Sequence, residues 1–299
     1  MLTGQFMRRI IRSANTKEFR LCNFKKIWYD MSKYAIKDAR MKVNLHTHTA
    51  RCGHASGTDE EYVLAAIEAG FDTLGFSDHT PFPYSSGFSC RCAAMIMDEL
   101  ENYITSVRLL QEKYQDKIKI LLGLECEPIP RFMSFLTELR PRLDYMILGN
   151  HGDREFEKYS GNLTTPEELW HYLEVTLSGM ESGLFLYVAH PDLLLHRYPE
   201  FDEDARKIST ILCREARRLN LPLEYNLNGL KNGPPEGGLG YPYHGFWEIA
   251  AQENVTAVVG VDAHQPQWLL DADINGAHKY LQELGIPVLD NPLALMQSR

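Results

Sequence analysis

Short apolar runs alternate along the chain with longer stretches in which apolar residues recur at helical spacing. The runs are rich in β-branched residues and only a few residues long, which is typical of strands that are buried on both faces. We therefore expect seven strands and a weaker eighth, at residues 42–46, 73–77, 118–125, 144–149, 185–190, 223–226, 256–261 and 286–289.

Helical signals fill the intervals between these runs. Thr58 to Glu61 and Thr165 to Glu168 have the spacing of capping boxes, and Pro166 would occupy a first helical position, where its missing N–H costs nothing. We expect one helix after Thr165 and others at residues 62–69, 93–114, 132–139, 203–219, 246–253 and 273–284. Strands alternating with helices favour a mainly parallel sheet with helices outside it, and so many units in one run favour a barrel.

Histidine and acidic residues stand where the predicted strands end. His46 and His48 close the first strand, and residues two apart on a strand point to the same face, so both imidazoles can reach one ion. Further candidates follow later strands or their loops: His54, Asp78, His79, Glu125, Asn150, His151, His190, Asp192, Glu224, Asn226, Asp262 and His264. In a barrel the carboxyl ends of the strands converge on one opening, where active sites lie. The pattern predicts a metal centre at that opening.

The ligand set indicates more than one metal ion. Seven of the 11 histidines occupy these positions. A catalytic zinc ion takes about four ligands and leaves one position open, so nine nitrogen and oxygen ligands fit two or three divalent ions better than one. Imidazole with carboxylate suits zinc, iron or manganese. Cys52 and Cys126 adjoin the cluster, but no CxxC spacing indicates a structural zinc site, and we expect neither thiol to be a ligand.

Charge and composition limit the kinds of partner that we expect the protein to bind. The 299 residues carry a net charge of −9, but residues 1–40 hold ten Lys and Arg against three Asp and Glu. We interpret residues 1–40 as a basic extension and residues 41–299 as one domain. The acidic body disfavours a nucleic acid partner, because basic residues must neutralise a phosphate backbone. No apolar run is long enough to span a bilayer, and the six cysteines form no disulfide framework, so we expect a cytoplasmic protein.

The motifs resemble those of the PHP (polymerase and histidinol phosphatase) family. The resemblance rests on His46-Thr-His48, His54 in Gly-His-Ala-Ser-Gly-Thr, Ser77-Asp-His79, Gly123-Leu-Glu125, Gly149-Asn-His151, Ala189-His190-Pro and Gly260-Val-Asp-Ala-His264. It runs in order across residues 41–299. The later segments, Glu224 to Leu230 and Tyr241-Pro242, are similar to those of the monofunctional histidinol-phosphate phosphatases. The resemblance to the PHP family implies a distorted (β/α)7 barrel with a trinuclear metal site.

The resemblance also implies a role for each ligand. The first ion would be held by His46, His48, Glu125 and Asp262, the second by Glu125, His151 and His190, and the third by His54, His79 and His264. Glu125 would bridge two ions. The implied activity is hydrolysis of a phosphomonoester, most of all L-histidinol phosphate in histidine biosynthesis, by a metal-activated hydroxide. The chain departs from the family after His151, where it reads Gly152-Asp-Arg154 and an apolar continuation is expected.

Several charged residues near the predicted ligands in the sequence are candidates to contact the substrate. Arg154 and Arg197 follow strand-end ligands and are candidates to bind the phosphate and act in catalysis beside Glu125 and Asp262, with Lys231 as a third option. Candidates for the general acid are Asp153, Asp192 and His196, and Glu224 or Asp153 could bind a substrate amine. A PHP phosphoesterase for a nucleotide or sugar phosphate is the nearest alternative. A metallo-dependent amidohydrolase also begins with HxH, but no strand-end lysine is present to be carboxylated. The oligomeric state is not indicated.

Overall fold

Parallel strands surrounded by helices make up the described part of the chain. The computed structural model describes residues 42–84, 94–152 and 158–298. The strands are β1 (Val43–Asn44), β2 (Thr73–Phe76), β3 (Lys119–Cys126), β4 (Tyr145–Leu148), β5 (Leu223–Asn226) and β6 (Ala257–Gly260). The helices are α3 (Asp59–Glu68), α4 (Leu100–Tyr114), α5 (Met133–Leu139), α6 (Pro166–Glu181), α7 (Glu203–Arg218), α8 (Asn228–Asn232), α9 (His244–Gln252), α10 (Pro266–Asp271) and α11 (Ile274–Glu283). The α/β class predicted from the sequence is confirmed.

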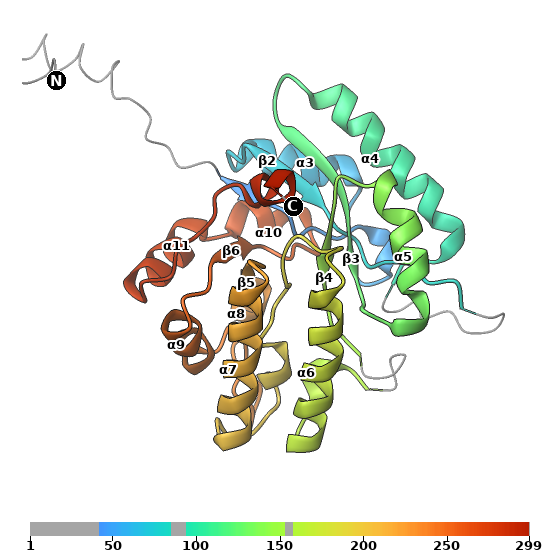
Figure 1. The fold of residues 1–299 in the computed structure, drawn as a ribbon. Helices are drawn as coiled ribbons and strands as arrows, with labels where there is room; N and C mark the ends of the chain where they lie inside the picture. The colour runs from blue at the N-terminus through green and yellow to red at the C-terminus, as the bar shows by residue number, and fades with distance from the viewer. Residues whose placement is uncertain (1–41, 85–93, 153–157, 299) are drawn as a thin grey trace, which may run out of the picture. The chain divides into compact units, whose positions relative to one another are not determined.

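The strands form two parallel sheets that single bridges connect. One sheet has the order β1-β2-β3-β4, and the other consists of β5 and β6. Val188 bridges to Leu148 on one side and to Leu223 on the other, and Thr47 bridges to Ala263. The strands run through the middle of Figure 1, with α6 and α7 side by side below them and α3 and α4 above.

Three predicted strands are shorter than expected or absent, and the structure gives a reason for the first two. The first ends at Asn44, where side-chain hydrogen bonds replace those between strands. The Asn44 Nδ2 donates to His46 O and Thr47 Oγ1, and the Asn44 Oδ1 accepts from Val261 N–H. The fifth, at residues 185–190, contributes only the Val188 bridges. Its neighbour Pro222 accepts from Val188 N–H but has no N–H to return. The weak eighth likewise contributes a single bridge, at Val288.

Both predicted capping boxes are present and fix the starts of two helices. Thr58 accepts from Glu61 N–H at the start of α3, and Thr165 accepts from Glu168 N–H at the start of α6, with Pro166 as the first residue. The short helices α8 and α10 were not predicted. Among the described residues, no helix is both long enough and apolar enough to cross a membrane.

Alternating side chains on the strands separate two apolar regions. On β3, Leu122 and Leu124 pack outward into the large core beneath the helices, whereas Leu121 packs inward with Tyr145. The ring of Tyr145 fills the space left by Gly75 and Gly123, where a Cβ would overlap it, and its hydroxyl donates to Leu45 O at 2.8 Å. Because Glu125 follows Leu121 and Gly123 at a spacing of two, its carboxylate also points inward, at the carboxyl end of the strand.

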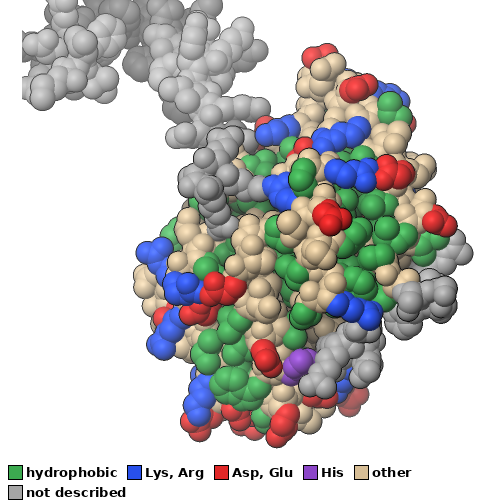
Figure 2. All heavy atoms as spheres, turned by 45° about the vertical axis from the view of Figure 1, so that its right-hand side comes forward, with side chains coloured by type: hydrophobic (Ala, Val, Ile, Leu, Met, Phe, Trp, Pro, Cys, Tyr) green, Lys and Arg blue, Asp and Glu red, His purple; other side chains and the backbone are tan. Residues whose placement is uncertain are grey.

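The surface shows no single-sign region on the face drawn in Figure 2. Lys and Arg side chains are interspersed there with Asp and Glu among apolar ones. Residues 1–40 lie outside the described residues, so the predicted basic extension stays a prediction.

Candidate metal centre

All nine predicted ligands meet at the carboxyl ends of the strands. Among the predicted ligands, four combinations have ligand atoms close enough for one ion: His46 with His48 and Asp262, His46 with Glu125 and His190, His48 with His79 and Glu125, and His54 with His79 and His264. His151 joins them through its Nε2, which lies 3.1 Å from His190 Nε2. Residues distant in sequence, from His46 to His264, therefore form one cluster.

The first pair of histidines faces a carboxylate. His46 Nε2 and His48 Nε2 are 3.1 Å apart. Asp262 Oδ1 lies 3.0 Å from the second of these nitrogens and 3.5 Å from the first. All three side chains are buried, so the group offers two imidazole nitrogens and one oxygen to a point shielded from solvent.

The two oxygens of Glu125 face different histidines. Oε1 lies 2.8 Å from His190 Nε2 and 3.4 Å from His151 Nε2. Oε2 lies 3.3 Å from His46 Nε2 and 3.5 Å from His48 Nε2. Gly149 leaves room for this carboxylate, because a Cβ at that position would overlap it. A carboxylate placed between two imidazole pairs has the geometry to bridge two ions.

The remaining histidines lie on the outer side of the cluster. His54 lies in the loop after a short 3-10 helix (Ala50–Cys52), and its ring centroid is 5.3 Å from that of His79 and 4.8 Å from that of His264. His79 Nδ1 is also 3.2 Å from Glu125 Oε2. This third group is more exposed than the other two, since His54 is at the surface.

Two of the predicted ligands have left-handed backbone. His190 has φ 27° and Asp262 has φ 52°, values that residues other than glycine rarely adopt. Such strain persists only where the surrounding structure holds it, and it is common at functional sites.

Hydrogen bonds to other carboxylates set the ring nitrogens that face the cluster. His46 Nδ1 is 2.8 Å from Glu224 Oε1, and His151 Nδ1 is 2.6 Å from Glu127 Oε1. Because a carboxylate only accepts, each Nδ1 carries a proton, which leaves Nε2 to face the cluster as the nitrogen that could bind an ion. Glu127 was not predicted from the sequence, and Glu224 was one of two candidates to bind a substrate amine.

That reading of Glu224 is wrong. The side chain is fully buried, and its oxygens accept from His46 Nδ1–H, His190 N–H and Asn226 Nδ2. It lies behind the predicted ligands, and it has no exposed surface with which to contact a substrate amine.

The donor set fits divalent cations. Two pairs of imidazole nitrogens face each other, and the buried oxygens Glu125 Oε2 and Asp262 Oδ1 accept no hydrogen bond from the described residues. Unpaired buried acceptors are costly unless a cation neutralises them. The described residues therefore make a site for divalent metal ions.

The electrostatics agree with this assignment. Burial lowers the pKa of His46, but Glu224, Asp262 and Glu125 outweigh it and raise that pKa well above its usual value. Burial likewise opposes the charged form of His151, and Glu125 and Glu127 still raise its pKa to about 9. Without metal these imidazoles hold protons, which a divalent ion would displace.

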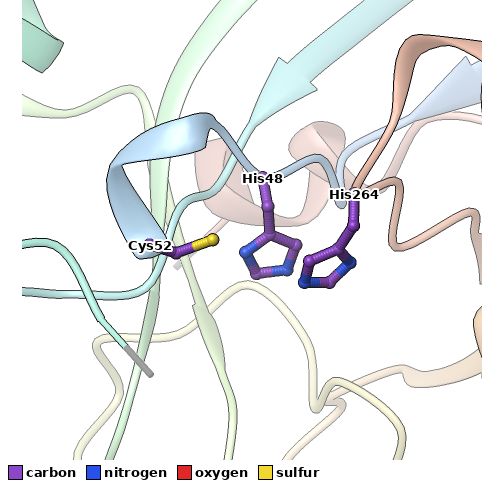
Figure 3. A group of neighbouring side chains, drawn as sticks. All are labelled: His48, Cys52 and His264. Atoms are coloured by element: carbon purple, nitrogen blue, oxygen red, sulfur yellow. The ribbon is translucent and has the colours of Figure 1, made fainter. Parts of the chain in front are cut away.

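The thiols near the cluster differ from its ligands. Figure 3 shows Cys52 pointing toward the His48 ring, with His264 beyond it; the two rings stack at 4.1 Å. His48, Cys52 and His264 could together hold an ion, but His48 Nε2 already faces His46 and Asp262. Burial and then Asp78 raise the pKa of Cys52 to about 12, which keeps the thiol protonated. Burial also raises the pKa of Cys126, whose thiol accepts from Thr80.

The structure describes only some of the residues predicted to contact the substrate. Arg154 and Asp153 lie outside the described residues. Arg197 is exposed and has no hydrogen-bond or ion-pair partner within the described ranges. Lys231 lies over the Trp268 ring, with Nζ 3.4 Å from its centroid.

The two described candidates for the general acid differ in environment. Asp192 is fully buried, and its Oδ2 accepts from Tyr243 N–H at 2.7 Å and Trp247 Nε1–H at 3.1 Å. Burial raises its pKa to about 7. His196 is partly buried; burial and then Arg197 lower its pKa.

Two tyrosines that were not predicted as site residues flank the cluster, although Tyr241 belongs to a segment that carries the family resemblance. The Tyr159 ring is parallel to that of His151 at a centroid distance of 6.3 Å. The Tyr241 ring meets His190 at 6.3 Å and His196 at 5.4 Å. The sequence offered no signal for Tyr159, since neither a strand nor a motif marks its position.

The fold and the centre define a class: α/β proteins with a divalent metal centre at the carboxyl ends of parallel strands. The model of the PHP domain matches residues 44–226, and the chain belongs to the PHP family.

Named relatives and a solved structure agree with this family. A Deinococcus radiodurans protein named "probable histidinol-phosphatase" is 30% identical over 237 residues, which cover 74% of this chain and 85% of that protein. The histidinol-phosphatase of Bacillus subtilis is 26% identical over 251 residues, covering 74% of this chain and 92% of the relative. The crystal structure of a Lactococcus lactis histidinol phosphate phosphatase, with zinc, L-histidinol and phosphate, superimposes with a TM-score of 0.63 at 20% identity and covers 83% of this chain and 95% of that one. This last likeness concerns the fold alone.

Proposed function

We propose that this protein is a metal-dependent phosphomonoesterase that hydrolyses L-histidinol phosphate to L-histidinol and phosphate. The observation that carries the proposal is Glu125, whose two oxygens face separate imidazole pairs in a buried cluster. Ions held on both sides of one carboxylate suit phosphoryl transfer to water. The names of the relatives supply the substrate, since two of them, over 85% and 92% of their length, are named histidinol-phosphatases.

The proposal includes three ions and a closed barrel. His46, His48, Glu125 and Asp262 would hold the first ion, Glu125, His151 and His190 the second, and His54, His79 and His264 the third; zinc, iron and manganese all suit these donors. The bridges through Val188 and between Thr47 and Ala263 connect each strand to the next, which supports a distorted seven-stranded barrel.

The chain's own residues prepare the site for this chemistry. Bound divalent ions lower the pKa of a water molecule and polarise the phosphoryl oxygens. Glu224 and Glu127 hold the imidazoles of His46 and His151 in one tautomer with Nε2 inward. Burial of the cluster excludes bulk water and so strengthens its electrostatic interactions.

Substrate binding falls to residues at the rim. Arg197, which is exposed and follows His196, and Arg154 are the proposed phosphate donors, because a guanidinium can bind phosphate with two parallel hydrogen bonds. Tyr159 and Tyr241 would flank the leaving group, since their rings lie against His151 and His190. Asp192 is less suited to act as general acid than expected, because its buried carboxylate already accepts two hydrogen bonds.

A substrate panel tests the proposal. Phosphate release is measured with L-histidinol phosphate beside nucleotide and sugar monophosphates, at matched metal content. We expect the highest kcat/KM for L-histidinol phosphate. Efficient turnover of another monoester with negligible hydrolysis of L-histidinol phosphate would refute the substrate and leave the metal chemistry standing.

A further inference from the structure

One buried carboxylate contacts ligands of two different proposed ions. Glu224 Oε1 accepts from His46 Nδ1–H at 2.8 Å. Glu224 Oε2 accepts from the backbone N–H of His190 at 3.0 Å. His46 belongs to the first proposed ion and His190 to the second, so this side chain lies behind both.

A third contact extends the same network to Asp262. Asn226 Nδ2 donates to Glu224 Oε2 at 2.8 Å and is 3.3 Å from Asp262 Oδ2. Asn228 Nδ2 donates to the same Asp262 oxygen at 3.1 Å. Asp262 thus keeps Oδ1 toward His46 and His48, while Oδ2 is held by amides linked to Glu224.

The packing around Glu224 leaves it one position. The side chain is fully buried, and Gly260 on the adjacent strand β6 lies so close that a Cβ there would overlap Oε1. The His190 backbone that Glu224 holds is itself in the left-handed region, where a hydrogen bond helps to keep it.

We propose that Glu224 is a shared positioning residue that couples the first and second metal subsites from behind their ligands. The inference rests on the metal site of the proposed function. Glu127 offers a contrast, because among the described residues its two carboxylate oxygens accept only from His151, through Nδ1–H at 2.6 Å and N–H at 2.9 Å. Glu224 should therefore govern two ions where Glu127 governs one.

The substitution Glu224→Gln tests this coupling with little change in size. Glutamine offers one acceptor oxygen in place of two, so either His46 Nδ1–H or His190 N–H would face an amide NH2 group. Partners that orient a ligand change metal affinity by about 10–100-fold when they are removed. We expect that loss for two ions in Glu224→Gln, for one ion in Glu127→Gln and for none in Glu112→Gln, which changes an exposed residue of α4.

The readout is zinc bound per chain, measured by elemental analysis after equilibration at a series of buffered free-zinc concentrations. In Glu224→Gln the third ion, at His54, His79 and His264, should keep its wild-type affinity. Loss of no ion, of one ion, or of all ions equally would overturn the inference. This assay needs no substrate. A wild-type protein that binds zinc but does not hydrolyse L-histidinol phosphate would therefore refute only the proposed substrate.

Two further measurements separate positioning from general stability. In proton NMR spectra, the downfield imidazole N–H signal of His46 should move upfield or disappear in Glu224→Gln, because a neutral amide replaces the carboxylate, and it should be unchanged in Glu127→Gln. Gly260→Ala keeps the carboxylate but forces it to move, so the same two ions should weaken. Wild-type affinity for both ions in a folded Gly260→Ala protein would also overturn the inference.

Discussion

Replacing Glu125 by Gln should loosen two ions together and abolish hydrolysis. The carboxylate lies between two imidazole pairs, with Oε1 2.8 Å from His190 Nε2 and Oε2 3.3 Å from His46 Nε2. An amide has one oxygen, and its NH2 group cannot bind a cation. Whichever way the amide turns, one pair of histidines loses its shared oxygen and both lose the negative charge.

The size of the effect follows from the burial of the site. Removing one partner of a buried charge pair costs about 3–5 kcal/mol, which corresponds to roughly a 10²–10⁴-fold weaker affinity for each ion. Glu125 is only 2% exposed, so solvent cannot compensate for the lost charge. At a free zinc concentration that saturates the wild-type protein, the variant should retain the third ion and lose the other two.

The assay is zinc per chain at buffered free zinc, with phosphate release measured on the same samples. Glu68→Gln, the same change on the exposed face of α3, is the matched control and should leave both quantities unchanged. Gly149→Ala should reproduce part of the loss, because a Cβ at that position overlaps the Glu125 carboxylate. Loss of a single ion in Glu125→Gln, with the other held at wild-type affinity, would refute the bridging role.

The remaining predictions concern pH, stability, the phosphate and the N-terminal segment. Burial opposes its charge, but Glu125 and Glu127 raise the pKa of His151 to about 9 in the metal-free protein, so this imidazole must release a proton to bind the second ion. The zinc affinity of that site should therefore fall by about tenfold for each pH unit below 9. A zinc titration that does not depend on pH would contradict this. Asp192→Ala leaves two buried N–H donors without an acceptor and should lower the free energy of unfolding by about 1–3 kcal/mol in denaturant titrations; unchanged stability would count against the buried contacts. Arg197→Ala should lower kcat/KM by about 10–100-fold through the loss of a charged hydrogen bond to phosphate, whereas Arg217→Ala, on an exposed turn of α7, should not; equal effects would exclude Arg197 as a phosphate donor. Deleting residues 1–40 should leave activity intact, and its loss in a folded protein would give that segment a role.

The sequence could predict which histidine and acidic side chains lie together, because the signal for this cluster is positional. A parallel strand that ends in histidine or an acidic residue delivers that side chain to the same opening as its neighbours, whatever the details of the connecting loops. β5 begins and ends as expected, and its carboxyl end carries Asn226 next to Asp262. For this reason His46 and His264, far apart in the chain, could be assigned to one cluster.

The functions of the supporting carboxylates could not be predicted in this way. Glu224 and Glu125 both lie on strands, and only the three-dimensional contacts show that Glu224 faces Nδ1 of His46, whereas Glu125 faces Nε2 of the same ring. The absent fifth strand has a similar origin, since Pro222 affects it from a distant part of the chain. Local sequence patterns do not contain such tertiary contacts.

Metal removal and return tests the central claim most directly. Protein depleted of metal by chelation is titrated with zinc, and ions bound and phosphate released from L-histidinol phosphate are measured on the same samples. The account predicts no hydrolysis by the metal-free protein and a return of activity only when the pair of ions that shares Glu125 is filled. Full activity in folded, metal-free protein would contradict it.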